Sequence, residues 1–148
     1  MHDTVIEGAQ GMGAWARDFI ATLKPEHGRA CVVALSGDLG AGKTTLAQGI
    51  ARALGVQEIV ISPTFVIEKI YQLHPGSQWR RLVHIDAYRL KDASELHAIG
   101  WDEVVADKDT IVLVEWPERI HVAIPPHTIR LTLSGSGNSR TITKETQV

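Results

Sequence analysis

The sequence has little of what stabilises small secreted proteins or anchors membrane proteins. Its one cysteine, Cys31, cannot form a disulfide within the chain, and it lies in an apolar run where a buried structural thiol is expected. No apolar stretch approaches the ~20 residues that span a bilayer, and residues 1–20 lack the continuous apolar segment of a signal peptide. We therefore expect a cytoplasmic protein that contacts no membrane.

An excess of positive charge is also missing. The chain has 15 lysines and arginines against 17 aspartates and glutamates, so it lacks the basic field that sequence-independent binding to nucleic acids uses. Any nucleic-acid role is expected to be indirect. With 148 residues, 44% of them hydrophobic, and no internal repeat or flexible linker, the sequence predicts one globular domain over residues 1–148.

Hydrophobic periodicity predicts strands and helices in alternation. Continuous apolar runs at 31–36 and 110–115 are typical of strands buried on both faces of a sheet. Helices are predicted around residues 15–23, from Lys43 to a C-terminal Gly55, and after the capping-box sequence at 92–95. Further strands are predicted at 4–7, at 65–73 and 81–88 as a hairpin around a short loop at 74–77, and at 128–134 and 141–143 as a closing hairpin.

Residues 37–44 match the phosphate-loop pattern G-x-x-x-x-G-K-[ST]. Its glycines allow backbone conformations closed to bulkier residues, so that loop N–H groups converge on phosphate oxygens. Lys43 supplies charge for the β- and γ-phosphates, and Thr44 is expected to place its hydroxyl on Mg²⁺. The loop residues expected to bind the nucleotide are Asp38, Leu39, Gly40, Ala41, Gly42, Lys43 and Thr44.

The order strand, glycine loop, helix predicts an α/β fold of the P-loop NTPase type. We expect three layers, with a mixed, mostly parallel sheet that includes an antiparallel hairpin portion. The N-K-x-D or T-K-x-D sequence that reads a guanine base is absent, and residues 107–109 have the wrong spacing for it. ATP is therefore the expected nucleotide, with Mg²⁺ as its metal.

Two carboxylates are candidates to complete a hydrolytic site. Glu115 ends the strand at 110–115, so it should project from the carboxyl end of the sheet, as an acid that holds the metal or orients water. Asp86 alternates with His84 and Tyr88, which puts three polar side chains on one face of a strand. The alternatives are a surface carboxylate for Glu115 and a structural pairing for Asp86. His84 is more typical of a hydrogen-bonded partner than of a metal ligand.

Three further features have both a functional and a structural interpretation. The segment 62–65, Ser-Pro-Thr-Phe, is either a switch whose hydroxyls sense γ-phosphate or metal, or a turn before a strand. Arg89 and Arg119 either neutralise charge that develops during phosphoryl transfer or are ordinary surface arginines.

These residues together resemble the TsaE family, also called YjeE, which are small P-loop ATPases required for threonylcarbamoyladenosine (t6A) formation on bacterial tRNA. The resemblance runs in order through 37–45, 62–65, 84–90, 99–101 and 114–119. It implies roles for Lys43 and Thr44 at phosphates and metal, for Thr45 beside them, and for Asp86, Glu115 and Trp116 near the γ-phosphate. It leaves open which carboxylate positions water, and the tail after Pro126 carries no motif that matches.

The resemblance also implies partners, the threonylcarbamoyl transferase subunits TsaD and TsaB, whose assembly ATP hydrolysis would reset. Two other functions use the same loop. A small-molecule kinase would need an arginine-bearing lid after the P-loop helix. The pattern of residues 59–73 in that region predicts a mostly apolar strand instead. A binding module gated by ATP would need no useful turnover.

Overall fold

The structure is a computed structural model that describes residues 2–25, 28–38, 40–58, 68–135 and 137–146. The strands are β1 (His2–Glu7), β2 (Cys31–Ser36), β3 (Glu68–Gln72), β4 (Arg81–Asp86), β5 (Thr110–Glu115), β6 (Ile129–Ser134) and β7 (Ser139–Thr146). The α-helices are α1 (Gly8–Thr22), α2 (Lys43–Ala53) and α3 (Trp101–Ala106), and the 3₁₀ helices are η1 (Ala93–Ile99) and η2 (Pro117–Ala123). None of the helices formed by the described residues is long and apolar enough to cross a membrane.

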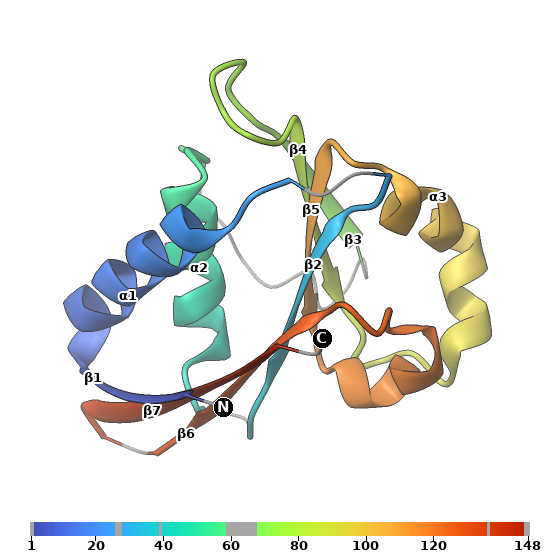
Figure 1. The fold of residues 1–148 in the computed structure, drawn as a ribbon. Coiled ribbons are helices and arrows are strands. Elements are labelled where there is room, and N and C mark those ends of the chain that lie inside the picture. The colour runs from blue at the N-terminus through green and yellow to red at the C-terminus, as the bar shows by residue number, and fades with distance from the viewer. Residues whose placement is uncertain (1, 26–27, 39, 59–67, 136, 147–148) are drawn as a thin grey trace.

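The described residues form a sheet of seven strands that lies between two layers of helices (Figure 1). The helices α1 and α2 cover one face of the sheet, and α3, η1 and η2 cover the other. Each layer has its own apolar core, with Phe19, Leu46 and Ile50 on the α1–α2 side and Leu96 and Val114 on the α3 side. This arrangement confirms the predicted three-layer α/β fold.

The sheet is parallel at its centre and antiparallel on both sides. Its order is β1-β7-β6-β2-β5-β4-β3, and parallel pairing joins β6, β2, β5 and β4. The hairpins β3–β4 and β6–β7 and the pair β1–β7 are antiparallel. Every residue of β5 is buried, because helices cover both faces of this central strand. The strand pattern predicted from the apolar runs is therefore confirmed.

The glycine at the contact between α1 and α2 brings these helices close together. A Cβ on Gly49 would lie 3.2 Å from Cβ of Ala16, so only glycine permits this approach without a shift of one helix. Packing at this contact fixes the position of α2, and with it the loop that leads from β2 into α2.

The strand predicted over residues 81–88 ends two residues early, at Asp86. The carboxylate of Asp86 accepts a hydrogen bond from the backbone N–H of Tyr88 (2.9 Å), an arrangement that turns the chain away from the strand direction. Tyr88 therefore does not continue the row formed by His84 and Asp86. The prediction that these three side chains share one face of a strand is wrong for Tyr88.

The predicted hairpin of β3 and β4 is confirmed, with a small change in its bounds. A turn forms at 74–77, with the Ser77 N–H donating to the His74 carbonyl (2.9 Å), and the connection spans residues 73–80, one residue more than the predicted strands leave between them. The Trp79 side chain of this connection is buried in the α1–α2 core.

At η1, Asp92 accepts from the Ser94 N–H (2.8 Å) as a cap should, but Glu95 accepts from the Lys91 N–H (2.7 Å), one residue before the cap. The short helix predicted after the capping-box sequence is confirmed, and it is a 3₁₀ helix, which winds more tightly than an α-helix.

Gly37, which follows β2, is expected to tolerate no side chain. Its φ is 147°, and a Cβ there would lie 2.7 Å from the carbonyl oxygen of Leu133 on β6. Gly37→Ala should lower the free energy of unfolding by about 1–3 kcal/mol, because the added methyl forces the loop away from β6. Gly76→Ala is the matched control, since a Cβ there meets no atom within 4 Å, and its effect should stay within about 0.5 kcal/mol. Urea unfolding measures both, and equal stability of the two variants would contradict the close approach.

Candidate nucleotide site

The carboxyl ends of three neighbouring parallel strands meet at one cavity. The phosphate loop follows β2, Glu115 is the last residue of β5, and Asp86 is the last residue of β4. The strand register pairs Glu115 with Leu35 on one side and with Asp86 on the other. The cavity has a volume of about 430 Å³ and is lined by Asp38, Gly40, Gly42, Lys43, Thr44, Thr45, Asp86, Tyr88, Glu115, Trp116 and Arg140. The structure thus brings together the loop and both carboxylates that the sequence singled out separately.

The loop adopts the backbone conformations that its glycines allow. Gly40 and Gly42 have φ of 82° and 101°, in the left-handed region that side chains rarely enter. The Ala41 N–H donates to the carbonyl of Asp38 (3.0 Å), and the Ala41 side chain is buried in the α1–α2 core rather than exposed in the cavity. Leu39, also predicted to bind the nucleotide, lies outside the described residues, as does the segment 62–65.

Lys43 begins α2 and is buried in the wall of the cavity. Its ammonium group donates to the carbonyl oxygens of Gly37 and of Asp38 (3.2 Å for Asp38), and it lies 3.9 Å from the centroid of the Trp116 ring. Burial lowers the pKa of Lys43 below its ordinary value of 10.5. The carboxylates that act in the opposite direction belong to Glu115, Glu118, Asp38 and Asp86. Among the described residues, the hydrogen bonds of this partly desolvated cation go to neutral carbonyl oxygens, which an anionic ligand can replace.

Glu115 is held by a buried histidine. Its Oε2 lies 2.7 Å from Nε2 of His84 on the adjacent strand, and the two side chains are only 3% and 0% exposed. Nδ1 of His84 is buried without a hydrogen-bond partner among the described residues, so the tautomer with its proton on Nε2 leaves no donor unpaired. His84 therefore orients Glu115, which agrees with its interpretation as a hydrogen-bonded partner.

Trp116 and Tyr88 form an aromatic wall beside Lys43. Trp116 has φ 60° and ψ 51°, and among the described residues it is the one non-glycine with a positive φ. Its ring centroid lies 4.9 Å from that of Tyr88, with the planes at 54°. A bulky residue held in this conformation costs free energy, and such residues cluster at functional sites. Arg119 lies outside the cavity, with its guanidinium carbon 5.5 Å from the Tyr88 centroid, and Arg89 does not line it either.

Thr44 and Glu115 bring oxygen donors to the same cavity, and oxygen ligands are those that Mg²⁺ prefers. Among the residues that the structure describes, no group of three or more His, Cys, Asp or Glu side chains is placed to hold a metal ion. The donor set fits a cation that takes its remaining ligands from phosphates and water, as Mg²⁺ usually does in nucleotide sites.

Arg140 is a cavity residue that the sequence pattern did not reveal. Its guanidinium donates to the carbonyl oxygens of Ala41 (3.0 Å) and Gly40 (3.3 Å), about a hundred residues earlier in the chain. The alternating pattern of the tail predicts a hairpin and nothing about its side chains. Pairing of β7 with β6 and β1 places Arg140 beside the phosphate loop. Its position could have been predicted only from the strand order of the sheet.

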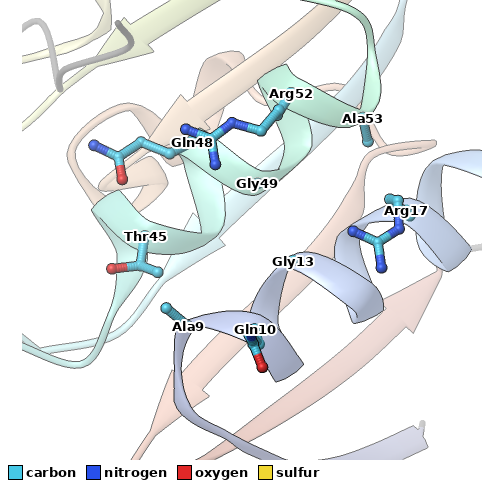
Figure 2. Close-up of a pocket in the computed structure, with 9 residues that line it drawn as sticks. All are labelled: Ala9, Gln10, Gly13, Arg17, Thr45, Gln48, Gly49, Arg52 and Ala53. Atoms are coloured by element: carbon cyan, nitrogen blue, oxygen red, sulfur yellow. The ribbon is translucent and has the colours of Figure 1, made fainter.

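A second cavity, of about 600 Å³, lies between α1 and α2 (Figure 2). It is lined by Ala9, Gln10, Gly13, Arg17, Thr45, Gln48, Gly49, Arg52 and Ala53. Thr45 belongs to both cavities, whereas neither predicted carboxylate lines this one. The second cavity therefore adjoins the candidate nucleotide site without sharing its acidic groups.

The buried lysine predicts a pH-dependent stability difference. Because burial lowers the pKa of Lys43, the folded state binds this proton less tightly than the unfolded state, and the charged lysine costs stability at neutral pH. The cost falls as the pH rises from the lowered pKa toward 10.5. Lys43→Met should therefore stabilise the ligand-free protein more at pH 7 than at pH 10 in urea unfolding. Lys24→Met, at an exposed lysine, is the control, and an advantage of Lys43→Met that grows with pH would contradict this account.

Comparison with known proteins gives a consistent result. A family profile described as threonylcarbamoyl adenosine biosynthesis protein TsaE matches residues 6–142. Proteins named tRNA threonylcarbamoyladenosine biosynthesis protein TsaE are 32% identical in Rickettsia bellii, over 88% of this chain and 84% of that protein, and 35% identical in Haemophilus influenzae, over 81% and 73%. The relative in Streptomyces coelicolor is 46% identical over 59% of this chain, and the match spans only 57% of that protein.

The fold has a counterpart among solved structures. The crystal structure of YdiB from Bacillus subtilis superposes with a TM-score of 0.78 at 29% identity, covering 99% of this chain and 86% of that chain. The family match, from residue 6 to residue 142, includes the phosphate loop, both carboxylates and Arg140. The chain belongs to the TsaE family.

Proposed function

We propose that this protein is a cytoplasmic ATPase that acts in the formation of t6A in tRNA. The observation that carries the proposal is the convergence of the phosphate loop, Asp86 and Glu115 on one cavity at the carboxyl ends of β2, β4 and β5. The relatives in Rickettsia bellii and Haemophilus influenzae are named for this biosynthesis, which supports the same role here.

ATP would bind with its phosphates against the loop N–H groups and the start of α2. Lys43 then exchanges the carbonyl oxygens of Gly37 and Asp38 for charged phosphate oxygens, which are stronger acceptors. The nucleoside extends toward an adjoining cavity of about 150 Å³ that shares Gly42, Thr45 and Arg140 with the phosphate cavity. Its apolar lining from Ile6, Ala9 and Met12 suits the face of a base.

Mg²⁺, held through Thr44 and Glu115, would neutralise charge on the phosphates. In hydrolysis, the oxygen of a water forms a bond to the γ-phosphorus while the bond from that phosphorus to the β–γ bridging oxygen breaks, giving ADP, phosphate and a proton. Asp86 lies beside Glu115 in the strand register and is assigned to orient this water. The hydrogen bond from His84 fixes one oxygen of Glu115 and restricts the carboxylate to one rotamer.

Turnover is expected to be slow in the isolated protein. Among the described residues, Arg140 is the arginine that lines the cavity, and its N–H groups already donate to backbone carbonyls. An arginine supplied at an interface accelerates many P-loop enzymes by 10³- to 10⁵-fold. We propose that TsaD and TsaB homologues are the partners that complete the site, so that contact with tRNA is indirect.

The assignment of the two carboxylates predicts different defects. Glu115→Gln should lower kcat for ATP hydrolysis by roughly 10²-fold or more and raise the Mg²⁺ concentration required, because a metal ligand is lost. Asp86→Asn should lower kcat to a similar degree without changing the Mg²⁺ requirement. The control is Asp102→Asn, at an exposed carboxylate, which should release phosphate from ATP at the wild-type rate. If both site variants hydrolyse ATP at the wild-type rate, the assignment is wrong. Transfer of labelled phosphate from ATP to a metabolite would indicate a kinase.

The cellular role predicts loss of the modified nucleoside. In bacteria depleted of their own TsaE, expression of the wild-type chain should restore t6A in tRNA, measured by mass spectrometry of nucleosides. Lys43→Ala should fail to restore it, and affinity purification should recover TsaD and TsaB more strongly with ATP than without. Full restoration by a hydrolysis-deficient Glu115→Gln that still binds ATP would favour a binding module gated by nucleotide over an ATPase.

A further inference from the structure

Arg140 links two segments that the chain order keeps far apart. Its Nε and Nη2 donate to the carbonyl oxygens of Ala41 and Gly40 in the phosphate loop, and its Nη1 donates to those of Gly137 in the β6–β7 turn and of Ser139 at the start of β7. The guanidinium thus directs four hydrogen bonds at backbone carbonyls. These four hydrogen bonds link the phosphate loop to the β6–β7 hairpin.

The hairpin that carries Arg140 is itself firmly held. Arg140 pairs with Ile6 in the β1–β7 ladder, and the Gly8 N–H at the start of α1 donates to the carbonyl of Asn138 (2.8 Å). Gly135 has φ 107°, and a Cβ there would lie 2.8 Å from the carbonyl oxygen of Ser139. Gly135 and Asn138 are therefore closely packed against their neighbours, and these contacts fix the origin of the arginine side chain relative to the loop.

The contacts of Arg140 determine how two peptide groups of the loop are turned. In a planar trans peptide, the carbonyl and the N–H of the following residue point in opposite directions. Because the Ala41 carbonyl faces Arg140, the N–H of Gly42 faces away from the guanidinium. Because the Gly40 carbonyl faces Arg140, the Ala41 N–H is turned to donate to Asp38. The contacts of Arg140 thus hold the Gly40–Ala41 and Ala41–Gly42 peptide groups in these orientations.

Arg140 forms no ion pair within 4 Å in the part of the chain that the structure describes. All its described hydrogen bonds go to carbonyl oxygens, and the ion pairs among the described residues do not include it. With Lys43 it gives the cavity two cations.

We propose that Arg140 is a positioning residue of the phosphate loop and the second cation of the site for a nucleoside di- or triphosphate. It holds the Gly40 and Ala41 peptides in their binding orientation and adds positive potential where the phosphates lie. The inference rests on the proposed function, since it names a residue for the same site. It assigns a role to the C-terminal hairpin, which would otherwise be only an extension of the sheet.

The test compares three variants by calorimetric titration with ATP, ADP and tripolyphosphate. Arg140→Gln should weaken the binding of all three by about 10- to 100-fold, the effect of losing hydrogen bonds from a charged donor. Arg140→Lys keeps the positive charge but loses the planar set of N–H donors that contacts several carbonyls at once. Its affinity should therefore lie between those of Arg140→Gln and wild type. The control is Arg130→Gln, at a half-buried arginine of β6 that lines neither the phosphate cavity nor the adjoining cavity of about 150 Å³, and it should bind like wild type.

Salt dependence separates the charge from a merely structural effect. The affinity of wild type and of Arg140→Lys should fall more steeply between 50 and 500 mM salt than that of Arg140→Gln, because the glutamine variant has one cation fewer at the site. Binding by a folded Arg140→Gln within twofold of wild type, or an equal loss in Arg130→Gln, would overturn the proposal. If instead the wild-type chain binds none of the three ligands, the proposed function itself is wrong.

Discussion

The parallel register of β2, β5 and β4 is the constraint on which the site depends. Leu35, Glu115 and Asp86 are paired across these strands, so the loop that leaves β2 and the two carboxylates that end β5 and β4 reach the same edge of the sheet. Helices on both faces shield the central strands β2 and β5 from water. The buried N–H and C=O groups of these strands must therefore pair with neighbouring strands. A shift of one residue in this register would send Glu115 to the opposite face.

Around this edge, the protein tolerates several local costs. Lys43 is partly desolvated, His84 keeps one buried nitrogen unpaired among the described residues, and Trp116 has a backbone conformation that a bulky residue normally avoids. Glu115 connects these sites, since His84 contacts it, its charge acts on Lys43, and the Trp116 ring covers Lys43. Such costs, concentrated in one place and supported by a packed sheet, are what pre-organisation for an anionic ligand requires.

The predictions from sequence succeeded where a local pattern has one structural meaning. A continuous apolar run bounded by turn residues becomes a buried strand, and β2 and β5 have the predicted bounds. They were wrong where a side chain competes with the backbone pattern. The Asp86 carboxylate accepts a hydrogen bond from the Tyr88 N–H where β4 ends, which a strand pattern does not report.

By itself, the sequence determined the phosphate loop, the helix that follows it and the carboxylates at the ends of two strands, because each of these depends on residues adjacent in the chain. The tertiary structure decided that His84 orients Glu115, that Trp116 covers Lys43, and that Arg140 reaches the loop from about a hundred residues away. These contacts arise from strand order and register. Pairings of that kind are set by the packing of the whole sheet, and no short stretch of sequence encodes them.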